Sequence, residues 1–108
     1  MDVTLTGSEI TINYSEPTTN KNGSALGDLE KTSIYTQIGA DVVKQKEVPA
    51  TSVSGGGAVS EKIVVAVSED AEVDVAVWAT ASDKVGNESI PSQVFTVRID
   101  HLAPSSPL

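Results

Sequence analysis

The stretch from Val73 to Ile99 decides the fold, and it reads VDVAVWATASDKVGNESIPSQVFTVRI. Apolar side chains occupy alternate positions in both halves: Val73, Val75, Val77, Ala79 and Ala81, then Phe95, Val97 and Ile99. A period of two places such a set on one face of a strand. The opposite phase would bury Asp74 or Arg98 without a partner, so we expect the valines to face the core. Trp78 then faces outward.

A polar turn separates the two halves. Asp83 at its first position and Gly86 at its fourth suit a type I turn, and Gly86 can take a positive φ. Pro91 lacks the N–H that a sheet ladder needs, so we expect it at the start of the second strand. The stretch therefore predicts a β-hairpin at the centre of a sandwich.

Five shorter runs complete the predicted strands. They cover residues 2–5, 9–14, 32–39, 41–48 and 62–67, although the last is apolar at nearly every position and its buried face stays undecided. Turn-forming residues at 16–28 predict a loop, and Ser54-Gly55-Gly56-Gly57 predicts a flexible turn. About seven short strands at this spacing indicate an all-β sandwich.

Composition limits the classes of partner. The 108 residues suit one domain, and only 4% of them are aromatic. The net charge of −8 should repel polyanions, which argues against nucleic acid and anionic membrane as partners. There is no cysteine, and no signal peptide or membrane span is recognised.

Three motifs occur in order along the chain. Residues 10–17 read ITINYSEP, residues 17–29 read PTTNKNGSALGDL, and Asp83 to Ser89 reads DKVGNES. They resemble, respectively, the second strand, the "PxTNxDGxxLxDL" loop and the "AxDxxGNES" turn of bacterial fibronectin type III domains. The tail APSSPL resembles the proline linker before a following repeat. Departures are Tyr14 for the usual Trp, Thr32 for a core Tyr, and Val73 at the tyrosine corner.

The resemblance implies a seven-stranded Greek-key sandwich of the fibronectin type III or immunoglobulin-like kind, with three strands in one sheet and four in the other. Residues 1–100 would form the domain and residues 101–108 a Pro/Ser linker or tail. It also implies a non-catalytic spacer or protein-interaction module within a larger, multidomain bacterial protein. That protein would be extracellular or on the cell surface, for example an adhesin or a virion protein.

An exposed patch is the first candidate site. In the strand order that the resemblance implies, Tyr35, Trp78, Thr96 and Arg98 share the outer face of one sheet. Trp, Tyr and Arg are enriched in binding hot spots, and Arg98 could lie over the Trp78 ring. The alternative is that Trp78 merely covers the sheet.

The turn formed by Asp83, Gly86, Asn87 and Glu88 is the second candidate, as a contact loop. Its oxygens are too few to hold calcium alone, since calcium takes six to eight ligands. Asp83 and Asn87 can instead cap the turn. We therefore predict no metal site.

Catalysis has no support in the sequence. His101 is the only histidine and stands in the predicted tail, so a Ser-His-Asp triad lacks a placed base. Without cysteine there is neither a thiol nucleophile nor a cysteine zinc site. We predict a non-enzyme without a cofactor.

Two other functions stay open beside the spacer or interaction module. Trp78 and Tyr35 could form the stacking platform of a small carbohydrate-binding module. The edge of the sandwich could instead mediate self-association, whereas a spacer should be monomeric in isolation.

Overall fold

The computed structural model describes all 108 residues as seven strands without a helix. The strands are β1 (Asp2–Thr6), β2 (Glu9–Ser15), β3 (Leu29–Ile38), β4 (Asp41–Pro49), β5 (Ala58–Val64), β6 (Glu72–Asp83) and β7 (Phe95–Asp100). No helix is present that could cross a membrane.

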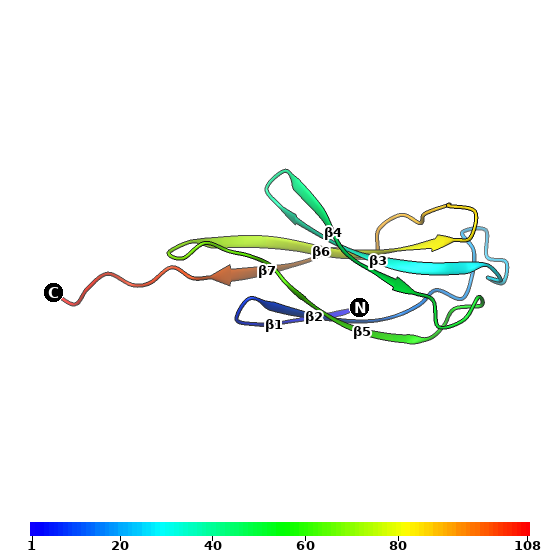
Figure 1. The fold of residues 1–108 in the computed structure, drawn as a ribbon, viewed down its shortest axis with the longest axis horizontal. Helices are drawn as coiled ribbons and strands as arrows, with labels where there is room; N and C mark the ends of the chain where they lie inside the picture. Colours follow the sequence, from blue (N-terminus) through cyan, green and yellow to red (C-terminus); the bar gives the residue numbers. More distant parts are fainter.

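The strands form two antiparallel sheets that lie face to face (Figure 1). The smaller sheet has the order β1-β2-β5 and the larger has the order β4-β3-β6-β7. The prediction of an all-β chain with seven strands in two sheets is thus confirmed, and the arrangement is consistent with a β-sandwich.

The central hairpin has the predicted phase. β6 pairs with β7 in the register Val73↔Ile99 and Val75↔Val97. Val75, Val77 and Ile99 are 0% exposed and join the isoleucines of β2 and β3 in one core cluster. Trp78 lies on the other face of the sheet and is only partly buried. The core is therefore built from β-branched side chains, which suit a pleated surface.

Three side chains on the outward phase are nevertheless buried: Ser33, Thr80 and Ser82. We expected all three to face solvent. The reason is that residues 84–94 fold back along β6, with a β-bridge between Ser82 and Glu88. This segment, named here the 84–94 loop, covers the outer face at one end of the larger sheet.

The strand predicted at residues 62–67 is misplaced, since β5 covers Ala58–Val64. Its inward positions include Glu61, which lies opposite Ile12 of β2. Because the charged Glu61 stands at an inward position, the sequence of β5 does not show a regular alternation of apolar and polar residues. The structure pairs that charge with Lys46 of β4, at 2.6 Å from Nζ to Oε2.

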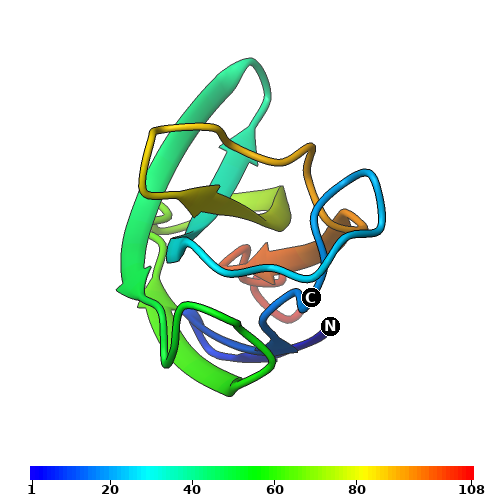
Figure 2. The same cartoon turned by 90° about the vertical axis from the view of Figure 1, so that its right-hand side faces the viewer.

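Three loops gather at one end of the sandwich, as the end-on view in Figure 2 shows: residues 16–28, 50–57 and 84–94. The turn Ser54-Gly55-Gly56-Gly57 was expected to be flexible, and the 50–57 loop that contains it is bonded to the buried Glu16. The Glu16 carboxylate accepts hydrogen bonds from Thr51 Oγ1 (2.5 Å), Thr51 N (2.9 Å) and Gly57 N (3.0 Å). Burial raises the pKa of Glu16, but these three hydrogen bonds outweigh it and hold the pKa below its usual value.

The chain leaves the sandwich at the other end (Figure 1). His101 remains part of the body, because its N–H donates to Ala71 O (2.8 Å) and its ring lies 3.0 Å from Ser8 Oγ. Residues 102–108 are exposed and extend away from the strands.

Candidate interaction surface

The two aromatic residues of the predicted patch lie side by side. Tyr35 of β3 is the direct cross-strand partner of Trp78 of β6. Their rings stack with centroids 5.7 Å apart and an interplanar angle of 9°. On the other side of Tyr35, where β4 pairs with β3, Lys44 Nζ lies 5.7 Å from the ring centroid. The Tyr35 ring is therefore flanked by Trp78 on one side and by the Lys44 ammonium on the other.

Glu88 fastens the 84–94 loop to this stack. Its Oε2 accepts a hydrogen bond from Thr80 Oγ1 at 2.6 Å and another from Tyr35 Oη at 2.7 Å. The Thr80 hydroxyl, followed by that of Tyr35, holds the pKa of the Glu88 carboxyl below its usual value. We name these residues the outer-face cluster: Lys44, Tyr35, Trp78, Thr80 and Glu88. Its members connect three strands to one loop.

Asp83 and Asn87 cap the turn that begins this loop. Asp83 Oδ1 accepts from the N–H groups of Val85 (3.1 Å) and Asn87 (2.9 Å), and Oδ2 accepts from Asn87 Nδ2 (3.0 Å). The Asn87 side chain, then the Asn87 N–H, lowers the pKa of Asp83. Gly86 has φ +90°, which a residue with a Cβ rarely adopts. Both carboxylate oxygens of Asp83 are thus used within the turn.

Serine side chains fix the rest of the loop to β6. Ser89 N donates to Ala81 O (2.8 Å), and Ala81 N donates back to Ser89 Oγ (2.9 Å). Ser92 and Ala79 form the same reciprocal pair at 2.8 and 3.0 Å. The serine hydroxyls take the place of carbonyl acceptors, so the loop follows β6 without being a regular strand.

The fastened loop presents apolar side chains to solvent. Val85 is 79% exposed, Ile90 74% and Val94 51%. An ordered loop with exposed apolar side chains can bind a partner at a small loss of conformational entropy. Sequence reasoning missed these residues, because their exposure depends on how the loop folds back over β6.

Arg98 and Thr96 share the face but lie apart from the aromatic stack. Arg98 donates to Asp74 Oδ1 from Nε (3.0 Å) and to Oδ2 from Nη2 (3.2 Å), and Nη1 lies 3.3 Å from Glu72 Oε1. The expectation that Arg98 lies over the Trp78 ring is wrong, because Asp74 is its direct cross-strand partner. Thr96 pairs with Ala76 and is exposed. The four predicted residues therefore form one face but not one contact cluster.

No family model, no curated protein and no solved structure matches the chain.

Proposed function

We propose that the chain is a fibronectin type III-like domain that serves as a non-catalytic spacer and protein-interaction module of a larger extracellular or cell-surface bacterial protein. The division into three strands and four, with the order β1-β2-β5 and β4-β3-β6-β7, supports the first part of this proposal. The directions of β1 and β7 support the role as a spacer.

The observation that carries the spacer role is that β1 and β7 run the same way along the long axis (Figure 1). A chain that enters at β1, near the middle of the long axis, therefore leaves β7 at the end of the body away from the three loops (Figure 1). The molecule measures 64 × 25 × 19 Å, and its radius of gyration of 16.5 Å exceeds the about 13 Å typical of a compact domain of this length. Such a body, including its extended tail, would hold two neighbouring domains of a longer protein apart.

The same strand directions determine how the domain responds to tension. Force applied at Met1 and Leu108 pulls along β1 and β7, so the hydrogen bonds to β2 and β6 are sheared together. Force applied at Glu69 and Leu108 acts at one end of the body and opens the β6–β7 ladder from Glu72↔Asp100, one pair at a time. A spacer that transmits tension should resist the first pull more strongly.

Single-molecule pulling tests this role. The chain has no cysteine, so a handle can be attached at a cysteine placed before Met1 or at Glu69→Cys, with the second handle at the C-terminal end. We expect a clearly higher unfolding force for end-to-end pulling than for the Glu69 geometry. Equal forces would remove the support that strand direction gives to the spacer role.

The carbohydrate-binding alternative is less well supported by the geometry. A sugar platform needs an exposed aromatic face, and the Tyr35 ring is flanked by Trp78 and Lys44. A glycan array comparing the wild-type chain with Trp78→Ala tests this function, and a specific signal that the variant loses would favour it.

A further inference from the structure

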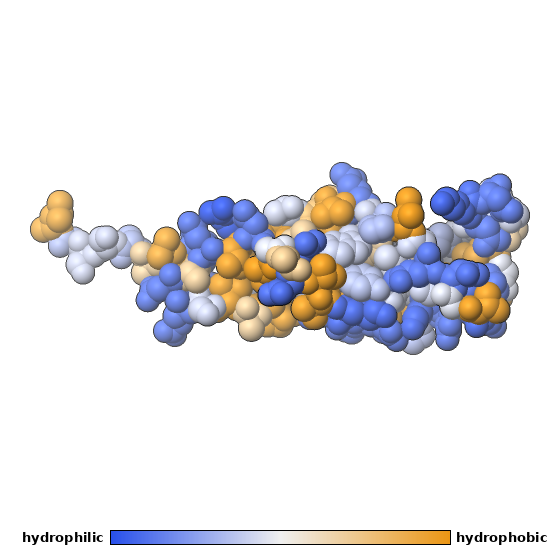
Figure 3. All heavy atoms as spheres, turned by 90° about the horizontal axis from the view of Figure 1, so that it is seen from above, coloured by the Kyte–Doolittle hydropathy of each residue, from blue (hydrophilic) through white to orange (hydrophobic).

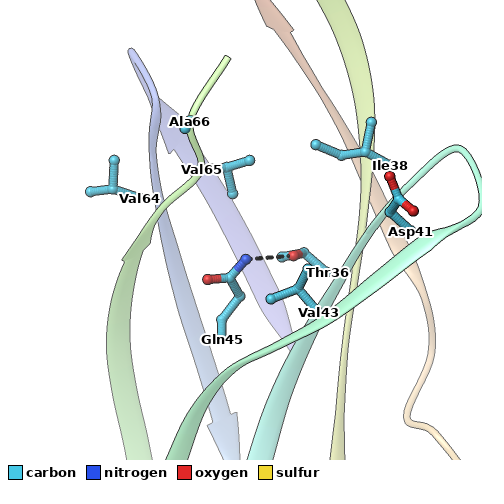
Figure 4. Close-up of a pocket in the computed structure, with 8 residues that line it drawn as sticks. All are labelled: Thr36, Ile38, Asp41, Val43, Gln45, Val64, Val65 and Ala66. Carbon is cyan, nitrogen blue, oxygen red and sulfur yellow. Dashed lines mark hydrogen bonds between the residues drawn. The ribbon is translucent and has the colours of Figure 1, made fainter.

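The two sheets separate along one side of the molecule, where the edge strands β4 and β5 diverge. A groove of about 440 Å³ opens there. Thr36, Ile38, Asp41, Val43 and Gln45 form one wall, and Val64, Val65 and Ala66 form the other (Figure 4). The Lys46–Glu61 ion pair joins the two strands beyond Gln45 and limits the groove in that direction.

The groove is apolar and leads towards the core. Val65 belongs to the buried core cluster, and Ile38 packs against that cluster. Val43 and Val64, at the mouth, are 48% and 67% exposed. Two of the three polar lining residues bond one another, since Gln45 Nε2 donates to Thr36 Oγ1 at 2.8 Å. An apolar side chain entering the groove would therefore not deprive these groups of their partner.

Both walls are also sheet edges with unpaired backbone groups. β4 pairs only with β3, and β5 pairs only with β2. Edge strands are usually protected by bulges, lysines or proline. On β4 these features, the bulge beside Tyr35 with Lys44, Lys46 and Pro49, all fall within residues 44–49. Residues 41–43 have no bulge, lysine or proline and carry only the single charge of Asp41, and Figure 3 shows apolar side chains gathered around the adjoining β3–β4 turn.

We propose that this groove binds an extended, basic segment of a partner protein, which adds a strand to residues 41–43 of β4. Strand addition takes affinity from main-chain hydrogen bonds and specificity from pockets for alternate side chains. Asp41 is the only charged residue of the lining and forms no ion pair. Together with the net charge of −8, it favours a segment carrying lysine or arginine. The same charge repels a second copy of the chain.

Peptide titration followed by amide NMR tests the proposal on the whole chain. The probe is the capped peptide Lys-Val-Thr-Val-Thr-Val-Lys, and its matched control is Glu-Val-Thr-Val-Thr-Val-Glu. We expect the basic peptide to shift the amides of residues 41–43 and 63–66 and to slow their hydrogen exchange. The acidic peptide should bind at least several-fold more weakly.

Two variants locate the binding. Asp41→Asn should weaken the basic peptide about two- to fivefold, as expected for one exposed ion pair. Val43→Asn should weaken it about fivefold, whereas Val53→Asn, in the 50–57 loop and similarly exposed at 44%, should not change it. The proposal is overturned if neither peptide binds at millimolar concentration, if both bind equally, or if the shifts map elsewhere. Concentration-dependent sedimentation of the free chain that Val43→Asn abolishes would identify a second copy as the occupant and also overturn it.

Discussion

Val77 and Trp78 are neighbours in the sequence and face opposite sides of the same sheet. Val77 is 0% exposed between the sheets, whereas Trp78 stacks on Tyr35 outside them. Val77→Asp would place an unpaired charge in the core and should cost about 4 kcal/mol of folding stability, or prevent folding. Trp78→Ala loses one aromatic stack and should cost about 1–2 kcal/mol. Urea denaturation of both variants measures the difference, and equal losses would contradict the strand phase.

Glu88 determines how firmly the 84–94 loop is held. Glu88→Ala removes the common acceptor of the Thr80 and Tyr35 hydroxyls and leaves the buried Thr80 hydroxyl without its partner. We expect a loss of about 1–2 kcal/mol and faster amide exchange at Asn87 and Ser89. Glu69→Ala is a matched control, because Glu69 is exposed and makes no side-chain hydrogen bond or ion pair. Unchanged exchange in Glu88→Ala would mean that the serine contacts alone hold the loop.

Alternation was enough to predict the phase of β2, β6 and β7, because an aspartate or arginine on each of the last two strands identifies the solvent side. It failed where a distant segment changes the environment of a strand. Ser33 and Thr80 have the outward phase but are buried, on a face where Glu88 of the 84–94 loop bonds Thr80. Glu61 has the inward phase, and its ion-pair partner is Lys46 of β4, a strand of the other sheet.

The residues that share the face of the candidate surface could be predicted from the sequence, but the contacts among them could not. Cross-strand register brings Tyr35 to Trp78 and Arg98 to Asp74, and a sequence read strand by strand does not give that register. Glu16 had no sequence signal at all. An acid before a proline suggests a solvated loop, whereas here its three donors come from residues 35 and 41 positions away.

Glu16 should make stability depend on pH. Its pKa is lower in the folded chain than in the unfolded chain, so the unfolded chain binds more protons as pH falls below about 4.5. The stability that Glu16 contributes is present above that pH and is lost as pH falls through the folded pKa. Glu16→Gln should cost about 2 kcal/mol at pH 7, with a smaller loss of stability on going to pH 3 than in the wild-type chain. Chemical denaturation at both pH values, with Glu30→Gln as an exposed control, checks this, and parallel pH profiles would contradict it.

Gly57 allows the 50–57 loop to approach Glu16. A Cβ at Gly57 would overlap the side chain of Thr51 and Glu16 Oε1, although its φ is not positive. Gly57→Ala should therefore cost about 2 kcal/mol through steric overlap alone. Gly27→Ala is the matched control, because a Cβ there meets no atom within 4 Å. Thermal melts of the two variants should differ clearly, and a neutral Gly57→Ala would mean that the loop can move away.

Ser33→Ala tests the opposite case, a substitution that should not lower folding stability. Its Oγ is buried without a hydrogen-bond partner on the outer face of β3, where its cross-strand neighbours are Thr80 and Glu47. A buried hydroxyl without a partner is unfavourable, so Ser33→Ala should leave stability unchanged or raise it by about 1 kcal/mol. Ser89→Ala removes a hydroxyl that accepts the Ala81 N–H and should lower stability by about 1 kcal/mol. Both substitutions delete a serine Oγ. If they change the free energy of unfolding with opposite signs in urea denaturation, the difference isolates the effect of the hydrogen-bond partner. A loss in Ser33→Ala as large as that in Ser89→Ala would show that the Ser33 hydroxyl is bonded, for example to a buried water.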